Sequence, residues 1–215
     1  MYYPTLKERQ RQERDTYSEG LSLRVHRALS WLQRAEMAED DDARFIFLWI
    51  AFNAAYAQEI DDNQRTAEQI AFKQFLEKVC ELDTAKRIDQ LVWEEFSGPI
   101  RVLLDSPYVL NAFWEFQRGE ISNEEWQNRL RKGKQTAQYA LAGGNTATLL
   151  GVLFSRLYTL RNQLIHGGAT WDSSINRAQL RDCSKLLHKF VPLLIETMMD
   201  NPQTLWGDAC FPVVK

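Results

Sequence analysis

Two side chains near the end of one apolar segment could cooperate to move a proton and neutralise a phosphate. In the stretch SRLYTLRNQLIHGGATW, residues 155–171, four residues separate Arg161 from His166, and Asn162 follows the arginine. A histidine exchanges protons near neutral pH, and an arginine offers five fixed N–H donors that match a phosphate. Without any metal ion, this pair is sufficient to cleave RNA through its own 2′-hydroxyl group. The histidine would move the proton, and the arginine would neutralise charge that develops on the phosphorane oxygens.

The same spacing also has a purely structural explanation. An arginine and a histidine at this separation occur together often by chance, so the spacing alone is weak evidence for a site. A histidine that ends a helix is also often no more than part of the helix C-cap. Both interpretations stay open on spacing alone.

Residues 146–166 are predicted to form the helix that positions Arg161, Asn162 and His166. Apolar residues recur along this segment at the spacing of one helix face, and they are Leu150, Leu153, Phe154, Leu157, Leu160 and Leu164. Arg161 falls within this stripe, whereas Asn162 and His166 share another face more than a quarter-turn away. Because an unpaired buried charge costs several kcal/mol, Arg161 needs a partner, which could be an acid, a second subunit or a bound anion.

The rest of the chain is also predicted to be helical, because glycine and proline are scarce and strand-like alternation is nearly absent. Further helices are expected over residues 16–38, 43–60, 67–82, 84–104, from about 107, over 122–142 and over 176–199, with a loop at 61–66. Gly98-Pro99 should break or kink one of them, and Pro192 should bend the last. These elements predict a single all-α domain.

Several of these helices carry clear local signals. In the first, Leu21, Val25, Leu29 and Leu32 recur at helical spacing, and Arg24, Arg27 and Arg34 are placed on the polar side. Residues 40–42 supply an N-cap and first-turn acids for the next helix, and Ser122 with Glu125 forms a capping box.

Composition narrows the class of protein. The chain has 215 residues, 45% of them hydrophobic, and a formal net charge of −3. An acidic chain is not suited to coating nucleic acid through bulk electrostatics, although a local site remains possible. The N-terminal segment lacks the apolar core of a signal peptide, and no segment has the long charge-free run of a membrane span. We therefore expect a soluble cytoplasmic protein without membrane association.

Metal and cofactor chemistry is not expected. The three cysteines lie at wide spacing without a zinc pattern. His26 and His188 each lack a second ligand four residues on. We predict neither a metal site nor a cofactor.

Other polar and aromatic residues have both a functional and a structural interpretation. Asn53 could reach the motif and hold a water or a ribose, or it could pin helix register through hydrogen bonds. Trp171, on the loop after His166, is a further candidate for contacting substrate. The basic run RLRKGK, residues 129–134, with Trp126 nearby, could contact phosphates and stack a base, or it could be a solvated helix face.

The segment LRNQLIHGG resembles the motif of the HEPN superfamily, in which an arginine, a polar residue and a later histidine end an apolar helix. FIFLWIAFNAAYA, residues 45–57, is similar to an early helix of one bacterial HEPN group. Residues 168–202 are similar to the segment that follows the motif in that group, and the tail with WG and FPVV also fits. The resemblance covers the two ends of the chain and leaves the middle uncovered.

The resemblance implies a HEPN-type up-and-down helical bundle, with core helices at about 16–62 and 146–200 and a helical insertion at about 65–142. It implies a homodimer in which the motif helices of two subunits face each other. Many members are metal-independent ribonucleases in toxin–antitoxin or phage-defence systems. Arg161 and His166 would then be catalytic, Asn162 would orient or assist, and RNA and an antitoxin protein would be the partners. Other members are non-catalytic modules, so binding of a protein, a nucleotide or RNA is the alternative.

Overall fold

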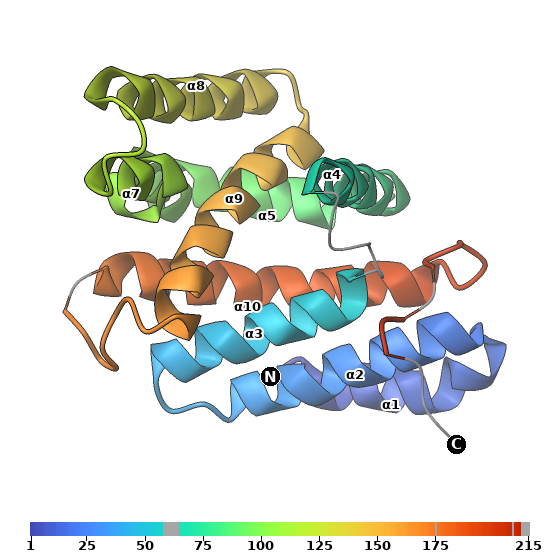
Figure 1. The fold of residues 1–215 in the computed structure, drawn as a ribbon. Helices are drawn as coiled ribbons and strands as arrows, with labels where there is room; N and C mark the ends of the chain where they lie inside the picture. Colours follow the sequence, from blue (N-terminus) through green and yellow to red (C-terminus); the bar gives the residue numbers. More distant parts are fainter. Residues whose placement is uncertain (58–64, 175, 208, 212–215) are drawn as a thin grey trace. The chain divides into compact units, whose positions relative to one another are not determined.

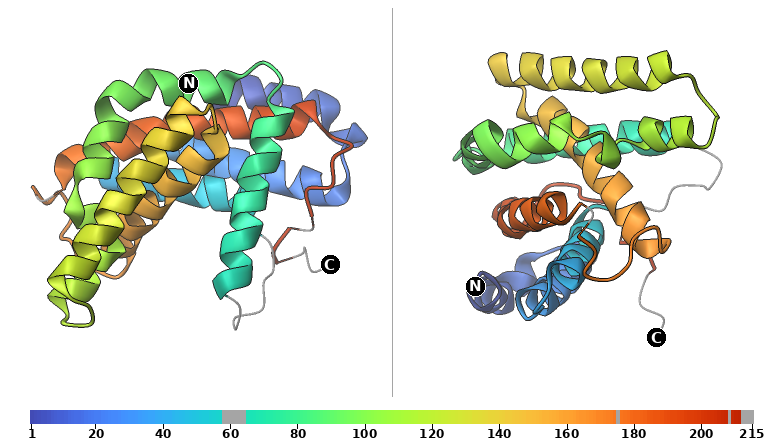
Figure 2. Two further views of the ribbon diagram at one scale, coloured as in Figure 1. Left: turned by 90° about the horizontal axis from the view of Figure 1, so that it is seen from above. Right: turned by 90° about the vertical axis from the view of Figure 1, so that its left-hand side faces the viewer.

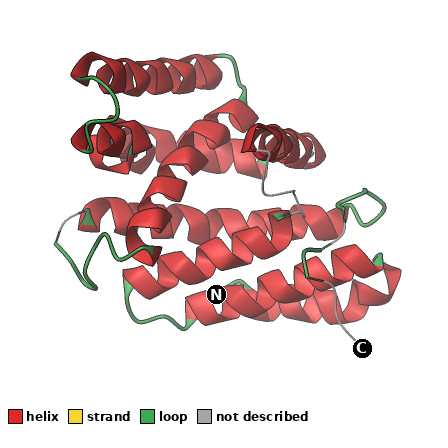
Figure 3. Ribbon diagram, in the orientation of Figure 1, coloured by secondary structure: helices red, strands yellow, loops and turns green. Residues whose placement is uncertain are grey.

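The computed structural model describes residues 1–57, 65–174, 176–207 and 209–211. Within these residues the chain forms ten α-helices and no strand, which confirms the all-α prediction (Figure 3). The beginning of the loop predicted at 61–66 and most of the FPVV tail lie outside the described residues. None of the helices in the described ranges is long and apolar enough to cross a membrane.

The chain divides into two compact units. Unit 1 comprises residues 1–85 and 184–215, and unit 2 comprises residues 86–183. The helix that carries the arginine–histidine motif groups with residues of the middle of the chain, in unit 2. The expectation of one domain with an insertion at about 65–142 stays a prediction.

Unit 1 contains α1 (Tyr3–Glu13), α2 (Glu19–Glu36), α3 (Asp41–Tyr56), α4 (Arg65–Leu82) and the larger part of α10 (Arg177–Asp200). Helices α1, α2 and α3 lie side by side (Figure 1). The predicted cap at Asp40 forms, because its side chain accepts from the backbone N–H of Ala43. A cap that was not predicted begins α2, where the side chain of Ser18 accepts from the N–H of Leu21. Ser18 therefore fixes the start of α2, and Asp40 fixes the start of α3.

The core of unit 1 is built from apolar stripes and an aromatic cluster. The leucines and the valine predicted to face inward on α2 are all buried. Phe52 on α3 packs against Phe72 of α4 at 6.1 Å and Phe190 of α10 at 6.3 Å, measured between ring centroids. Phe75 packs in turn on Trp206 at 6.3 Å. The burial of these rings holds the helices of the unit together.

The burial of Arg24 contradicts one prediction about α2. The helical wheel places it on the polar side, yet its exposed fraction is 0%. Its Nη1 donates to the carbonyl of Ala55 at 2.8 Å, and its Nε donates to the carbonyl of Gly207 at 3.2 Å. Ala55 lies in the last turn of α3, where carbonyls lack helical partners. A guanidinium that satisfies such carbonyls can be buried, which a polar-versus-apolar pattern does not anticipate.

Unit 2 contains α5 (Arg87–Glu95), a π-helical segment (Phe96–Ile100), α6 (Arg101–Asp105), a 3₁₀ turn (Pro107–Val109), α7 (Asn111–Gln117), α8 (Asn123–Ala142), α9 (Thr146–Ile165) and the start of α10. The π-helical segment contains Gly98-Pro99, so the predicted break is confirmed. The predicted cap at Ser122 also forms, with Glu125 as donor. Helices α8 and α9 lie against each other (Figure 2).

Candidate functional site

Helix α9 positions the motif. Its N-cap is Asn145, whose side chain accepts from the backbone N–H of Thr148 at 2.9 Å. The predicted apolar stripe is buried from Leu150 to Leu160, while Leu164 is half-buried. The helix contacts α5, α6, α8 and the 3₁₀ turn. Because one side of α9 is held along its length, its C-terminal turn has a defined position in unit 2.

Arg161 lies half-buried in this last part of α9, beside Asn162. Its Nη1 donates to Oδ1 of Asn162 at 2.9 Å, and its Nε is buried without a hydrogen-bond partner. An amide oxygen accepts a hydrogen bond but carries no full charge. The positive charge and one N–H donor of Arg161 therefore remain available to an anion.

His166 stands at the end of α9. The helix ends at Ile165, one residue earlier than predicted, and His166 is the C-cap residue. Its backbone N–H donates to the carbonyl of Asn162 at 3.0 Å, and its imidazole is exposed. Gly167 follows with φ +69, in the left-handed region that favours glycine after a helix. Asn162 thus contacts both motif residues, Arg161 through its side chain and His166 through its carbonyl.

Gln163 is a supporting residue that the sequence analysis missed. Its Nε2 donates to the carbonyl of Tyr108 at 2.7 Å, and its Oε1 accepts from Nδ2 of Asn176 at 3.4 Å. The same Tyr108 carbonyl accepts from Nε1 of Trp114 at 2.8 Å. These bonds tie α9 to the 3₁₀ turn and to the residue before α10. No periodic signal could have identified Gln163, because its partners lie far away in sequence.

The two substrate-contact candidates lie in different units. Trp171, in unit 2, has an exposed fraction of 76% and belongs to the turn that follows the motif. An exposed indole offers a face on which a base can stack. Asn53, in unit 1, is half-buried on α3, and its carbonyl accepts from the N–H of Ala57 at 2.7 Å. A substrate contact stays a prediction for both residues.

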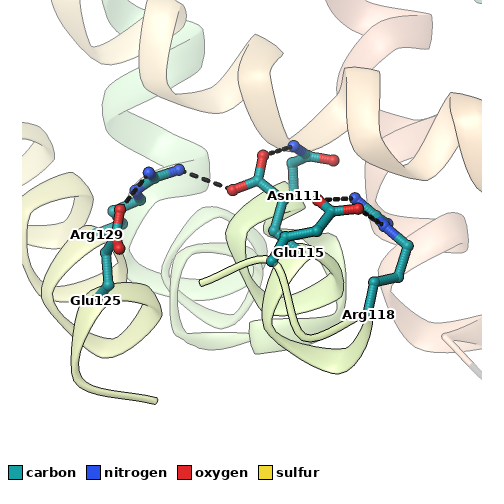
Figure 4. A network of polar contacts seen from close by, with 6 residues as sticks. Asn111, Glu115, Arg118, Glu125 and Arg129 are labelled. Carbon is teal, nitrogen blue, oxygen red and sulfur yellow. Dashed lines mark hydrogen bonds and ion pairs between the residues drawn. The ribbon is translucent and has the colours of Figure 1, made fainter. Parts of the chain in front are cut away.

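Two of the four cations in the basic run at 129–134 form ion pairs within unit 2. Arg129 pairs with Glu115 of α7 at 2.8 Å and with Glu125 at 2.5 Å, in a network that Figure 4 shows. Lys134 pairs with Asp105 at 2.5 Å. These exposed pairs compensate the charges that a phosphate would need, which favours the interpretation of this run as a solvated helix face.

Trp126, the aromatic residue beside that run, is engaged as well. Its ring lies 5.3 Å from Phe113 and 6.1 Å from Phe116, between centroids. Its Nε1 donates to Asn123 at 2.8 Å. The indole therefore packs α8 on α7 instead of offering a free face to a base.

Potential metal ligands do not gather anywhere in the described ranges, where no group of three or more histidine, cysteine, aspartate or glutamate residues could hold an ion. The three cysteines are free thiols. Burial raises the pKa of the Cys183 thiol, so this side chain is a poor nucleophile.

Comparisons of the chain with protein-family models, with curated proteins and with solved structures find no match. A partly buried guanidinium with an unpaired N–H donor can bind a phosphate, and an exposed imidazole at the end of the same helix can exchange a proton.

Proposed function

We propose that this chain is a HEPN-type, metal-independent endoribonuclease with its active site at the end of α9. The observation that supports this most directly is Arg161, whose Nε is buried without a partner while its charge faces no more than an amide. His166 follows at the C-cap with an exposed imidazole. Arg161 stabilises the phosphorane, His166 moves the proton, and Asn162 orients Arg161.

The proposed reaction uses the substrate's own 2′-hydroxyl group. His166 removes the 2′-hydroxyl proton as the 2′ oxygen attacks the adjacent phosphorus. The bond from phosphorus to the 5′ oxygen breaks, and the proton returns to that leaving oxygen. The products are a 2′,3′-cyclic phosphate and a 5′-hydroxyl group. Arg161 matters most at the phosphorane stage, when negative charge on the non-bridging oxygens is greatest.

The fold that accompanies this proposal is a HEPN-type bundle that pairs with a second copy through α9. Tyr158 and Ile165, with exposed fractions of 52% and 47%, lie on the face of α9 that carries Asn162. Apolar surface beside a polar site supports a contact with another subunit. The setting we propose is a cytoplasmic toxin–antitoxin or phage-defence system, with RNA as substrate and an antitoxin protein as regulator.

A cleavage assay on total RNA in the presence of EDTA tests the proposed roles. Arg161→Ala and His166→Ala should each lose at least about a hundredfold in cleavage rate, as expected when a transition-state donor or a proton-transfer group is removed. Arg101→Ala is the matched control, since Arg101 is an exposed arginine of the same unit. Cleavage that persists in an Arg161→Ala, His166→Ala double variant would overturn the proposal. Light scattering should give the mass of a dimer at micromolar concentration.

A non-catalytic HEPN module that binds a partner protein, a nucleotide or RNA is the second candidate. The acidic net charge of −3 favours it, as does the pairing of the basic run with Glu115, Glu125 and Asp105. This alternative predicts a stable complex in pull-downs and no cleavage at any pH or with any metal ion. A variant-sensitive cleavage activity would exclude it.

A further inference from the structure

Arg156 is a buried cation that the proposed nuclease chemistry does not use. It lies on α9 with an exposed fraction of 2%, and both its Nε and its Nη1 are buried without a hydrogen-bond partner. Burial lowers the pKa of Arg156 to about 10, so the guanidinium remains protonated at neutral pH. A buried charge without a counter-charge is strongly unfavourable, and this one therefore calls for a ligand.

Gly133 of α8 provides the space in which this guanidinium lies. A Cβ atom at position 133 would stand 3.1 Å from Nη2 of Arg156. Glycine is unfavourable inside a helix compared with alanine, and here its missing side chain admits the guanidinium. Gly133 itself is half-exposed, whereas the guanidinium that lies against it is almost wholly buried.

The charge of the neighbouring lysine is already compensated, which leaves Arg156 as the cation that requires an anion. Lys134 lies next to Gly133, and its Nζ is 2.5 Å from Oδ1 of Asp105. A water molecule could accept a hydrogen bond from Nε or from Nη1, but it would leave the charge of Arg156 uncompensated. An oxyanion meets both requirements, because it carries the counter-charge and its oxygens accept charged hydrogen bonds from the guanidinium.

We propose that Arg156 and Gly133 form a binding site for a phosphate-type oxyanion between α8 and α9. The site uses a cation that the proposed nuclease chemistry does not use, since Arg156 is buried against α8 whereas the imidazole of His166 is exposed. Binding neutralises the buried guanidinium and so stabilises the packing of α9 on α8. The oxyanion is either free phosphate or the phosphate group of a nucleotide.

Thermal unfolding of the full chain with inorganic phosphate tests the site. Ligand that binds the folded state raises Tm with concentration, but phosphate also stabilises proteins non-specifically by exclusion from their surface. Wild type is therefore compared with Arg156→Met and with Arg101→Met, which removes an exposed arginine of the same unit. Sodium chloride at matched ionic strength controls for screening.

The site predicts a saturable rise of Tm with phosphate in wild type and in Arg101→Met. In Arg156→Met the apparent Kd should be at least about tenfold weaker, because two charged hydrogen bonds are lost. Gly133→Ala, which favours the helical state of α8, crowds Nη2 and should weaken phosphate binding as well. This second variant decides the question if Arg156→Met does not fold.

The source of the phosphate group is found in the same experiment. Adenosine 5′-monophosphate acting more tightly than inorganic phosphate, with adenosine inactive, identifies a nucleotide phosphate. Inorganic phosphate acting alone identifies the free ion. An equal response to phosphate in wild type, Arg156→Met and Gly133→Ala would overturn the proposal, and so would a wild-type response no larger than that to sodium chloride.

Discussion

At the scale of single residues, Asn162 is the link between the two proposed catalytic groups. Its Oδ1 accepts from Nη1 of Arg161 at 2.9 Å, and its carbonyl accepts from the N–H of His166 at 3.0 Å. The hydrogen bond to His166 uses the backbone carbonyl of Asn162. A substitution of the Asn162 side chain therefore removes the hydrogen bond to Arg161 and leaves the one to His166. Asn162 is therefore a positioning residue for Arg161 in the proposed mechanism.

Substitutions of Asn162 distinguish a role in positioning Arg161 from a role in binding the substrate. Asn162→Ala should lower kcat by about tenfold or more with little change in KM, because one hydrogen bond to a charged group is lost. Asn162→Asp should be more damaging, since a carboxylate would neutralise the charge that the phosphorane needs. Steady-state kinetics on a defined RNA provide both constants. A rise in KM with unchanged kcat would contradict the positioning role.

His188 gives unit 1 a pH-dependent stability. Burial lowers the pKa of His188 below its ordinary value of 6.5, and the N-terminus and Arg44 lower it further, whereas Glu36 raises it. Because the unfolded chain binds this proton more readily, the associated stability is present above about pH 6.5 and is lost as pH falls through the folded pKa.

A variant without a titratable ring at this position tests that dependence. His188→Phe retains an aromatic ring against Tyr2, whose centroid lies 5.3 Å from that of the histidine. Between pH 7 and pH 5, its Tm should fall less than that of the wild type. Equal losses of Tm in the two proteins would show that other groups account for the acid sensitivity.

At the scale of helices, the signals that sequence analysis could use were local ones. The cap at Ser122 and the break at Gly98-Pro99 were predicted because each depends on residues within one turn. Helix α1 was missed, since Leu6 and Gln10 are its only buried residues and form no apolar stripe. It is built instead from good helix formers with a proline at its start.

The burial of two arginines is the feature that the sequence pattern predicts least well. Arg24 and Arg156 lie inside helix packing, although a pattern of polar and apolar types assigns arginine to the surface. Arg24 is satisfied by carbonyls that are distant in sequence, and Arg156 depends on a glycine of another helix. Such pairings are set by tertiary structure and leave no periodic trace. The position of Arg161, Asn162 and His166 at a helix end was predictable, because these residues belong to one continuous segment. Their role as a site stays a prediction.

The positive φ of Gly167, directly after α9, leads to a further prediction. Its φ of +69 is unfavourable for a residue with a side chain, so Gly167→Ala should cost about 1–2 kcal/mol or shift the turn that holds His166. We expect a loss of cleavage activity larger than the loss of stability explains. Gly151→Ala, inside α9 with no atom within 4 Å of the added Cβ, is the control and should be neutral or slightly stabilising. Equal activity in both variants would count against a fixed position for His166.

At the scale of the whole molecule, the charge balance favours local recognition of RNA. The net charge is −3, and Arg129 and Lys134 of the densest basic run are paired with acids. RNA binding should therefore release few counterions. Each phosphate neutralised on a single strand contributes a slope of about −0.7 to the plot of log K against log salt concentration. We expect a total slope shallower than about −2, and a steep slope would reveal a wide basic surface.

The most direct test of the proposed function is an analysis of the RNA ends that the wild-type protein produces in EDTA. The proposed mechanism predicts 2′,3′-cyclic phosphate and 5′-hydroxyl ends, because the attacking oxygen is the 2′-hydroxyl group of the substrate and His166 exchanges its proton. His166→Ala should yield neither end above background. Products with 5′-phosphate and 3′-hydroxyl ends, or cyclic phosphates formed equally by His166→Ala, would contradict the assignment of the site to Arg161 and His166.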